Sequence, residues 1–207
     1  MTERTRVQRH PERGVYARET IDAILDEALI CHVGFVVDGQ PYVIPMIQAR
    51  AGDVVYLHGS TASRLVRTLA NGVDVCVTAT LLDGIVLARS VYNHSMNYRS
   101  AVVLGRARPV VDPEEKLAAL ETIVEHMVPG RWSDARLPDR KELKATTVLA
   151  LALDEASAKI RTGPPKEWDE DLDLPIWAGV IPLSLVSGAA ETDASVPSGV
   201  PRPPYAP

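Results

Sequence analysis

The sequence predicts a mainly β fold, a small antiparallel β-barrel with peripheral helices. About six or seven short apolar runs rich in β-branched residues follow one another between turn signals, with only two or three helical segments among them. Strands and helices do not alternate regularly, and the chain has no GxGxxG motif, so a parallel sheet of βαβ units is disfavoured. Consecutive short strands of this kind are typical of small barrels.

Three segments have the periodicity of helices. The first is predicted over residues 18–28, where apolar residues recur at spacings of three and four. A short helix over 62–70 ends at an Asn-Gly pair, residues 71–72, which is a common C-terminal stop. The third begins at Asp112, a capping residue followed by proline at the first helical position. We expect its apolar stripe to lie in the core or in an interface: Leu117, Leu120, Val124 and Met127.

The predicted strands cover residues 30–37, 42–49, 54–57, 73–80, 85–89, 100–111 and 146–160. An Asp-Gly pair at 38–39 separates the first two, and a second Asp-Gly pair at 83–84 separates 73–80 from 85–89. Asp-Gly between two apolar runs is a strong short-range signal for a hairpin. The sequence therefore predicts two hairpins in the first half of the chain.

The composition is that of an ordinary globular protein. Of 207 residues, 46% are hydrophobic and 24% are charged, and the net charge of −5 excludes a general nucleic-acid-binding surface. No apolar stretch approaches the roughly 20 residues that span a membrane, and no signal sequence opens the chain. Cys31 and Cys76 lie in apolar runs and are expected to be reduced core thiols. We expect a soluble cytoplasmic protein that binds neither nucleic acid nor membrane.

The chain divides into three parts. Residues 1–17 form an N-terminal arm whose arginines alternate with glutamates, which favours a solvated arm over a functional basic patch. Residues 18–185 are expected to form one domain. Residues 186–207 are rich in proline and poor in apolar residues, so a disordered tail is expected there.

The most informative stretch is the junction after the strand 54–57. The strand breaks at Gly59, and a helix opens among small hydroxyl residues that include Ser60 and Ser63. Free N–H groups at such a junction suit a phosphate, Arg64 adds a cation, and His58 places an imidazole beside them. Strand–turn–helix junctions are common, however, and most of them bind nothing.

Three further segments are candidates for a ligand site. Pro45 interrupts the strand 42–49, which suits either an unpaired strand that lines a flat ring or an edge strand that tolerates a proline. The segment 92–100 concentrates aromatic and amide side chains before a strand, and it is either a binding loop or a polar surface connection. Trp168 and Trp177 lie in Pro/Gly-rich segments, where they cover a ligand or partner, or pack the C-terminal segment onto the barrel.

Other chemistries have little support. The five histidines have no metal-binding spacing with cysteines or carboxylates, so no metal site is expected. The chain has no GxSxG motif, no P-loop and no paired carboxylates. Cys76 lies in an apolar run, which disfavours a nucleophilic role.

Taken in order, these segments resemble the pyridoxamine 5′-phosphate oxidase-like superfamily of FMN-binding split barrels, and within it the flavin-nucleotide-binding and 5-nitroimidazole reductase-like branch. The similarity covers residues 13–183, and it rests on an ordered set of segments and on no single motif. The segments are Glu19–Leu25, Val43–Pro45, Tyr56–Gly59, Tyr98–Ser100 running on to Gly105, Lys159–Pro164 and Trp177–Pro182.

The resemblance implies a six-stranded antiparallel split barrel over residues 18–185 and a homodimer with two FMN molecules at the subunit interface. By position, residues 43–46 lie against the flavin ring, residues 58–64 hold the phosphate, and residues 98–100 contribute from the next segment. It also implies that His58 is the catalytic residue. The implied cofactor-binding residues are Val43, Ile44, Pro45, Met46, His58, Gly59, Ser60, Ser63, Arg64, Tyr98, Arg99, Ser100 and Trp177.

The implied function is that of an FMN-dependent oxidoreductase. Electrons would pass from NADH or NADPH through FMN to oxygen or a small organic acceptor of the nitro type, with His58 as a proton donor. The chain differs from the oxidase itself, since Arg64-Leu65-Val66-Arg67 only loosely matches its phosphate motif and its C-terminal Trp-Arg signature is absent. Oxidation of pyridoxamine phosphate is therefore disfavoured.

Four alternatives stay open. The same site would serve a flavin-binding carrier or sensor without turnover of its own, or a barrel whose site has decayed. A deazaflavin in place of FMN is also compatible with the sequence. Some relatives of this fold bind haem, and His32, His94 and His126 are the conceivable axial ligands.

Overall fold

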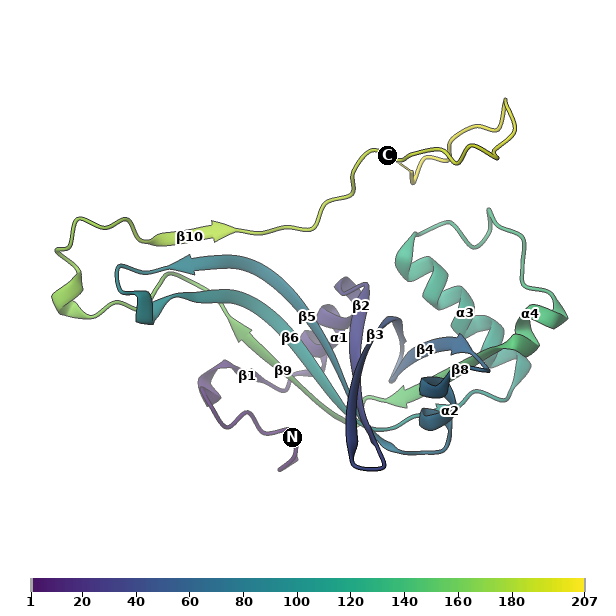
Figure 1. The fold of residues 1–207 in the computed structure, drawn as a ribbon, viewed down its shortest axis with the longest axis horizontal. Coiled ribbons are helices and arrows are strands. Elements are labelled where there is room, and N and C mark those ends of the chain that lie inside the picture. Colours follow the sequence, from purple (N-terminus) through teal and green to yellow (C-terminus); the bar gives the residue numbers. More distant parts are fainter. Residues whose placement is uncertain (1, 207) are drawn as a thin grey trace.

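The structure, a computed structural model, describes residues 2–206. Its strands form one antiparallel sheet of ten strands in the order β1-β9-β6-β5-β2-β3-β4-β8-β7, with β10 beside β5 (Figure 1). The mainly β antiparallel prediction is therefore confirmed, although the sheet has more strands than the expected six-stranded barrel. Among residues 2–206, no helix is long and apolar enough to cross a lipid bilayer.

The elements in chain order are η1 (Pro11–Arg13), β1 (Gly14–Val15), α1 (Arg18–Glu27), β2 (Ile30–Val37), β3 (Gln40–Ala51), β4 (Val54–Ser60), α2 (Arg64–Ala70), β5 (Asp74–Leu87), η2 (Val91–Asn93), β6 (Ser95–Arg106), β7 (Arg108–Pro109), α3 (Pro113–Met127), α4 (Arg140–Ala145), β8 (Thr146–Ala152), β9 (Glu155–Arg161), η3 (Asp169–Asp171) and β10 (Gly179–Pro182).

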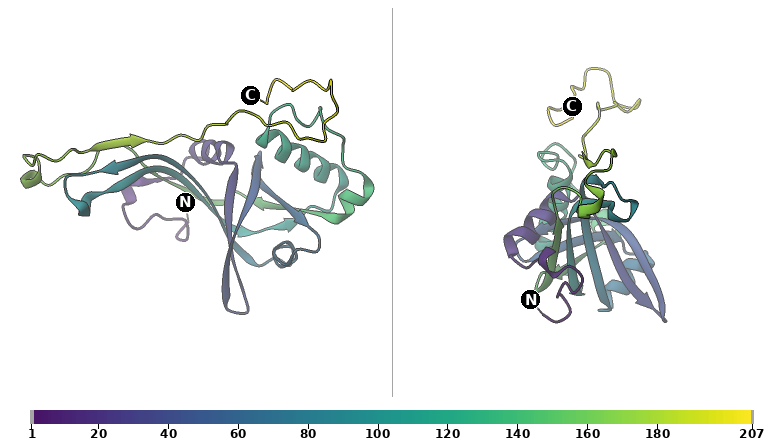
Figure 2. Two further views of the ribbon diagram at one scale, coloured as in Figure 1. Left: turned by 45° about the horizontal axis from the view of Figure 1, so that its top comes forward. Right: turned by 90° about the vertical axis from the view of Figure 1, so that its left-hand side faces the viewer.

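The core lies inside the curved sheet and draws on most of the chain. Fully buried side chains from α1, β4, α2, β5 and β8 share one apolar cluster: Leu25, Leu57, Leu69, Val77 and Leu149. A smaller cluster forms where α3 packs on β3, β4 and β8, through Ala119 and Ile123. The two further views show α1 and α3 lying against the sheet and α2 at the barrel end (Figure 2).

A long arm projects from the barrel. The ends of β5 and β6 run together beyond the other strands, and β10 pairs with the end of β5 (Figure 1). The segment 162–178 turns at the tip of this arm, where the Glu167 carboxylate accepts hydrogen bonds from the backbone N–H and the Nη1 of Arg89. The arm therefore ties a late segment of the chain to the hairpin between β5 and β6.

Several predicted strand boundaries are wrong. The Asp-Gly pair at 83–84 is a bulge inside β5 and not a hairpin turn, because Gly84 lies against β10: a Cβ there would meet Val180 at 2.9 Å. The segment 92–100 is not a single loop, since β6 begins at Ser95. The predicted strand 146–160 is a hairpin of β8 and β9 with a turn near Asp154, and β10 had no prediction.

The predicted helices are confirmed with small changes. Asp112 caps α3 by accepting a hydrogen bond from the N–H of Glu115 at 2.9 Å. The buried face of α3 is formed by Ala119 and Ile123, however, and the predicted stripe flanks that face without being fully buried. The helix α4 was not predicted, although Asp139 forms a capping box with Glu142.

The C-terminal tail forms no helix or strand over residues 183–206. Near its end the Tyr205 hydroxyl donates to Asp134 at 2.5 Å and accepts from Arg131 at 3.0 Å. A contact at one point does not test whether the rest of the tail is ordered. The expected disorder of residues 186–207 and the three-part division of the chain stay predictions.

The sheet opens within β3. Residues 40–47 of β3 pair with β2, whereas residues 48–51 pair with β4. Gln48, which is fully buried, lies at this change of partner. Its Nε2 donates to the carbonyls of Leu25 and Ala28 at 2.7 and 2.5 Å, so the end of α1 is tied to the point where the sheet opens.

We expect Gln48→Leu to lower the free energy of unfolding by about 1–3 kcal/mol, because the buried carbonyl of Leu25 loses its hydrogen-bond donor. The measurement is urea unfolding followed by circular dichroism. Gln40→Leu on the same strand is the matched control, since Gln40 is exposed and a change within about 0.5 kcal/mol is expected there. Equal stability of the two variants would contradict the role assigned to Gln48.

Candidate functional site

Two unpaired strand edges face each other where the sheet opens. Beyond Gln48, residues 43–46 of β3 pair only with β2, and residues 58–60 of β4 pair only with β8. Backbone groups on the facing edges are therefore free of strand partners, and a proline such as Pro45 is tolerated on an edge of this kind. We call this opening, with residues 43–46, 58–60, Ser63 and Arg64 around it, the split site.

The helix α2 brings a cation to the split site. The Arg64 guanidinium lies over the Tyr42 ring, with its Cζ atom 4.6 Å from the ring centroid, and Tyr42 in turn stacks on Phe35 at 5.5 Å. Within residues 2–206, no carboxylate lies within 4.0 Å of Arg64 or Arg67. These two arginines are therefore available to an anion, unlike the arginines of α1, β3 and β6.

The small residues of the junction are explained by packing as well as by a ligand. A Cβ on Gly59 would lie 2.8 Å from Val66 Cγ2, so glycine lets α2 approach β4. The Ser60 hydroxyl accepts a hydrogen bond from the N–H of Ala62 at 3.2 Å, and the Ser63 side chain forms no capping bond. Because α2 has only seven residues, Arg64 would contribute more to holding a phosphate than the helix dipole.

His58 lies half-buried at the end of β4, next to the split. Its Nδ1 is buried and has no hydrogen-bond partner among residues 2–206. Burial lowers the pKa of the imidazole below its ordinary value of 6.5. The ring is therefore neutral at neutral pH, which suits a hydrogen-bonding group or a proton acceptor better than the expected proton donor.

The predicted residues of β6 belong to a second group. Arg99 donates hydrogen bonds to two carboxylates, those of Glu27 and Asp83, each at 2.8 Å. These bonds raise the pKa of Arg99 and leave its charge compensated, which argues against a role in phosphate binding. Ser100 Oγ donates to the Lys159 carbonyl at 3.3 Å, and Tyr98 pairs with Arg161 across the sheet.

The two groups are apart within one chain. Strands β5 and β2 separate β6 from β3, so Tyr98–Ser100 lies three strand spacings, roughly 14 Å, from the edge of β3. Trp177 is further away, on the arm, with its indole over Gly179. The structure thus brings together nine of the thirteen predicted cofactor-binding residues and leaves apart Tyr98, Arg99, Ser100 and Trp177.

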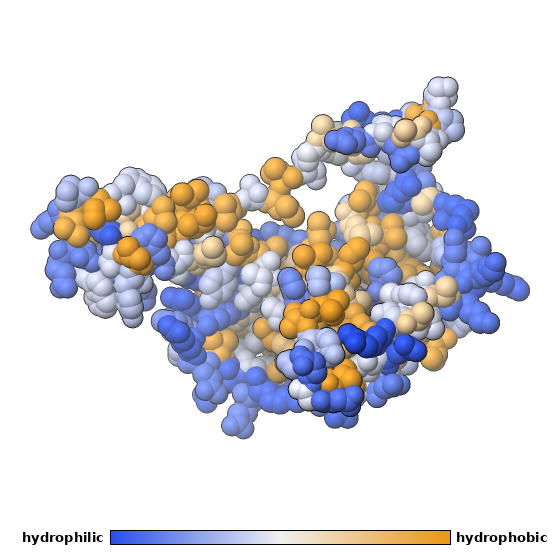
Figure 3. Space-filling view, viewed as in Figure 1, coloured by the Kyte–Doolittle hydropathy of each residue, from blue (hydrophilic) through white to orange (hydrophobic). Residues whose placement is uncertain are grey.

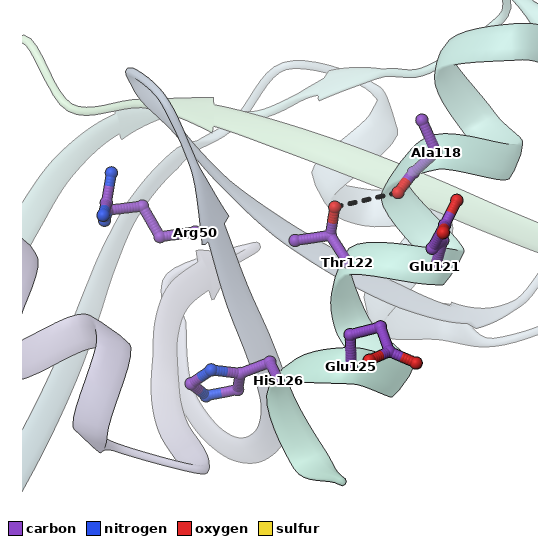
Figure 4. Close-up of a pocket in the computed structure, with 6 residues that line it drawn as sticks. All are labelled: Arg50, Ala118, Glu121, Thr122, Glu125 and His126. Atoms are coloured by element: carbon purple, nitrogen blue, oxygen red, sulfur yellow. Dashed lines mark hydrogen bonds between the residues drawn. The ribbon is translucent and has the colours of Figure 1, made fainter. Parts of the chain in front are cut away.

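A separate pocket of about 520 Å³ lies between β3 and α3, away from the split site (Figure 4). Most of its polar lining groups have partners in the chain: Arg50 pairs with Asp26, and Glu125 accepts from two backbone N–H groups, whereas Glu121 has no partner among residues 2–206. His126 directs its Nε2 to the Ala28 carbonyl at 3.0 Å. The pocket therefore presents no set of free groups that would select a ligand.

The sequence analysis left two residues out of its site. The Tyr42 ring forms a cation–π contact with the Arg64 guanidinium. Arg67, one turn along α2, adds a second cation without a carboxylate partner among residues 2–206. The spacing of three between the two arginines places both on one side of a helix and was the available signal. The contact between Tyr42 and Arg64 could not be predicted from the sequence, because it depends on how α2 packs against β3.

The fold is that of a small split-barrel protein, and the split site is its candidate site for an anionic ligand. The family described as pyridoxamine 5′-phosphate oxidase matches residues 17–160. The chain therefore belongs to the pyridoxamine 5′-phosphate oxidase family. No curated protein matches it significantly.

Three solved structures are similar to this chain in sequence and fold. Flavocytochrome Anf3 from Azotobacter vinelandii is 43% identical with a TM-score of 0.93, over 99% of this chain and 95% of that one. An FAD- and haem-binding protein from Mycobacterium smegmatis is 39% identical with a TM-score of 0.89, over 93% and 95% of the two chains. A candidate 5-nitroimidazole antibiotic resistance protein from Bacteroides thetaiotaomicron is 26% identical with a TM-score of 0.58, over 71% and 86%.

We expect the cofactor-free protein to lose stability as the pH falls below about 6.5, and His58→Gln to lose less. The unfolded chain takes up a proton on His58 in this range, whereas burial keeps the folded ring neutral, so the contribution is present above the unfolded pKa and is lost below it. Thermal unfolding of both proteins between neutral and mildly acid pH measures the difference. Parallel curves for the two proteins would contradict the assignment.

Proposed function

We propose that this protein is a redox protein that binds a flavin at the split site and a haem as a second cofactor. The observation that carries the proposal is its identity of 43% and 39%, over nearly the whole chain, to a flavocytochrome and to an FAD- and haem-binding protein. A bound flavin exchanges hydride or single electrons and a bound haem exchanges single electrons, so these cofactors supply the redox chemistry.

The residues of the split site fit a phosphorylated flavin. Arg64 offers an uncompensated guanidinium, and its place over Tyr42 holds it at the opening of the sheet. The free edge of β3 at residues 43–46 offers backbone groups and apolar side chains to a flat ring. His58 offers a buried imidazole nitrogen that has no partner within the described chain. In this proposal Arg64 compensates phosphate charge, and neutral His58 forms a hydrogen bond with the cofactor or accepts a proton.

We propose FAD in place of the FMN implied by the sequence resemblance. The relative from Mycobacterium smegmatis is described as binding FAD, and it covers 93% of this chain. The two flavins share the ring and the first phosphate, so the roles of Arg64 and His58 are the same for both. The additional nucleotide of FAD would extend beyond the split site.

We propose a homodimer with the flavin between the two subunits. Tyr98–Ser100 lies outside the split site of its own chain, roughly 14 Å across the sheet from the edge of β3, and a second copy would bring these residues to that site. The outer face of β2, β3 and β5 carries exposed apolar side chains that a second copy would cover: Ile30, Val36, Val43 and Leu82. In a two-fold dimer, Tyr98–Ser100 of one copy would complete the split site of the other.

A second candidate function is transfer of electrons from a nicotinamide cofactor to oxygen or a small organic acceptor. The relative from Bacteroides thetaiotaomicron, described as a candidate nitroimidazole resistance protein, favours an acceptor of the nitro type. Steady-state oxidation of NADH and NADPH with a panel of acceptors tests this function. A flavin carrier or sensor would bind the same cofactors and oxidise neither nucleotide.

We expect the purified protein to retain flavin and haem absorbance bands through gel filtration, and denaturation to release FAD. Arg64→Ala should weaken FAD binding about tenfold, because a charge-assisted hydrogen bond to the phosphate is lost. Its effect on thermal stability should be small, since only an exposed cation–π contact is removed. Isothermal titration of cofactor-free protein with FAD gives the affinity.

Two controls make this test specific. Arg106→Ala removes an exposed arginine of β6 that is already paired with Asp74, and it should leave the affinity near that of the parent protein. Riboflavin, which has no phosphate, should bind the parent and Arg64→Ala equally well. Retention of neither flavin nor haem would contradict the proposed function, and equal FAD affinity of Arg64→Ala would remove Arg64 from the site.

A further inference from the structure

The histidine at the tip of the arm has the geometry of a metal ligand. His94 follows η2, and its Nδ1 lies 3.0 Å from the Ser90 carbonyl. A carbonyl only accepts hydrogen bonds, so Nδ1 carries the hydrogen and Nε2 carries the free lone pair. The ring is exposed, and Nε2 has no partner among residues 2–206. Histidines that ligate metals commonly have their other nitrogen fixed in this way.

His10 has the same arrangement, with its Nδ1 3.1 Å from the Glu12 carboxylate, but it precedes η1 and β1 and lies outside the arm formed by β5, β6 and β10. The remaining histidines lack this arrangement. His126 uses Nε2 for its hydrogen bond to the Ala28 carbonyl, which leaves only Nδ1, the nitrogen nearer the backbone. His58 has its Nδ1 buried without a partner, so nothing fixes its ring from behind. Within residues 2–206, no hydrogen bond orients the ring of His32 on the outer face of β2.

An exposed apolar surface adjoins His94. Ile85 of β5 lies opposite both Met96 of β6 and Ile181 of β10, so the three side chains share one face of the arm. Leu87 is on the same face, two residues further along β5. We call this surface the arm face, made of Ile85, Leu87, Met96, Ile181 and the Trp177 indole described next.

The arm face extends to His94 through Trp177. Gly179 pairs with Leu87, and a Cβ on Gly179 would lie 2.8 Å from the Trp177 ring, so the indole covers Gly179 on the arm face. Val86 pairs with Ser95, and continuing this register sets His94 opposite Leu87. Trp177 is 65% exposed and Met96 is 44% exposed, and apolar residues gather along the arm at the left of Figure 3.

A cation completes the surroundings. Arg89, two residues after Leu87, pairs through Nη1 with Glu167 at 3.2 Å. Its Nε is buried and has no acceptor within the described chain. Arg89 therefore places a guanidinium next to the arm face, and Glu167 compensates its charge.

We propose that His94 is an axial ligand of the haem and that the arm face covers one side of the macrocycle. This inference rests on the proposed function, because it assigns the residues of a cofactor proposed there. A haem is a flat, largely apolar macrocycle whose iron takes axial ligands from the protein. The arm tip offers an apolar face and an oriented imidazole in one place.

The test is titration of the purified, haem-depleted full-length protein with haemin, followed by its Soret band. His94→Ala should weaken haemin binding about tenfold or more and shift the band, whereas FAD binding stays unchanged. Added imidazole should restore the band position of the parent protein in this variant. His126→Ala is the matched control, and it should bind haemin as the parent protein does.

The outcomes separate the ligand assignment from the proposed function. If His94→Ala binds haemin with the affinity and the band of the parent, the assignment is overturned and haem binding itself stands. If His94→Ala keeps FAD but imidazole does not restore the band, His94 acts through the fold and not as a ligand. If the parent protein binds no haemin, both the assignment and the haem part of the proposed function fall.

Discussion

The change of partner within β3 is the constraint on which the rest of the structure depends. One strand cannot stay paired with β2 and β4 along its whole length once the two halves of the sheet diverge. Gln48 marks the divergence, and its amide ties the end of α1 to it. The divergence leaves free edges at residues 43–46 and 58–60, and these edges are the candidate site. The opening of the sheet and the candidate site thus have one origin, the change of partner within β3.

The arginines on the surface fall into two groups, those paired with carboxylates and those without such a partner in the described chain. Arg99 and Arg50 are each held by carboxylates, as is expected of arginines that stabilise the fold. Arg64 has an aromatic ring beneath it and no carboxylate beside it. A guanidinium without a carboxylate partner, placed at an opening of the sheet, can form charge-assisted hydrogen bonds with a phosphate. On the arm, the exposed apolar side chains of the arm face have no covering segment in the described chain.

Local sequence patterns indicate which residues of the split site lie near one another but not how the arm forms, for one physical reason. Residues 43–46 and 58–64 come together through neighbouring strands and a short turn, which local patterns describe. The bulge at Gly84 depends on β10, which lies almost a hundred residues later, so an Asp-Gly pair was interpreted as a turn. The compensation of Arg99 by Glu27 and Asp83 likewise joins distant segments. Gln48 gives no signal in the sequence at all.

The most direct test of this account is amide hydrogen exchange, resolved to single residues, with and without FAD. The account predicts slower exchange on FAD binding at residues 43–47 and 58–66 of one subunit, and at residues 95–100 through the arm of the other. Protection at the first two segments alone would support the split site in a monomer. Protection confined to the pocket between β3 and α3, around Arg50 and His126, would contradict the account.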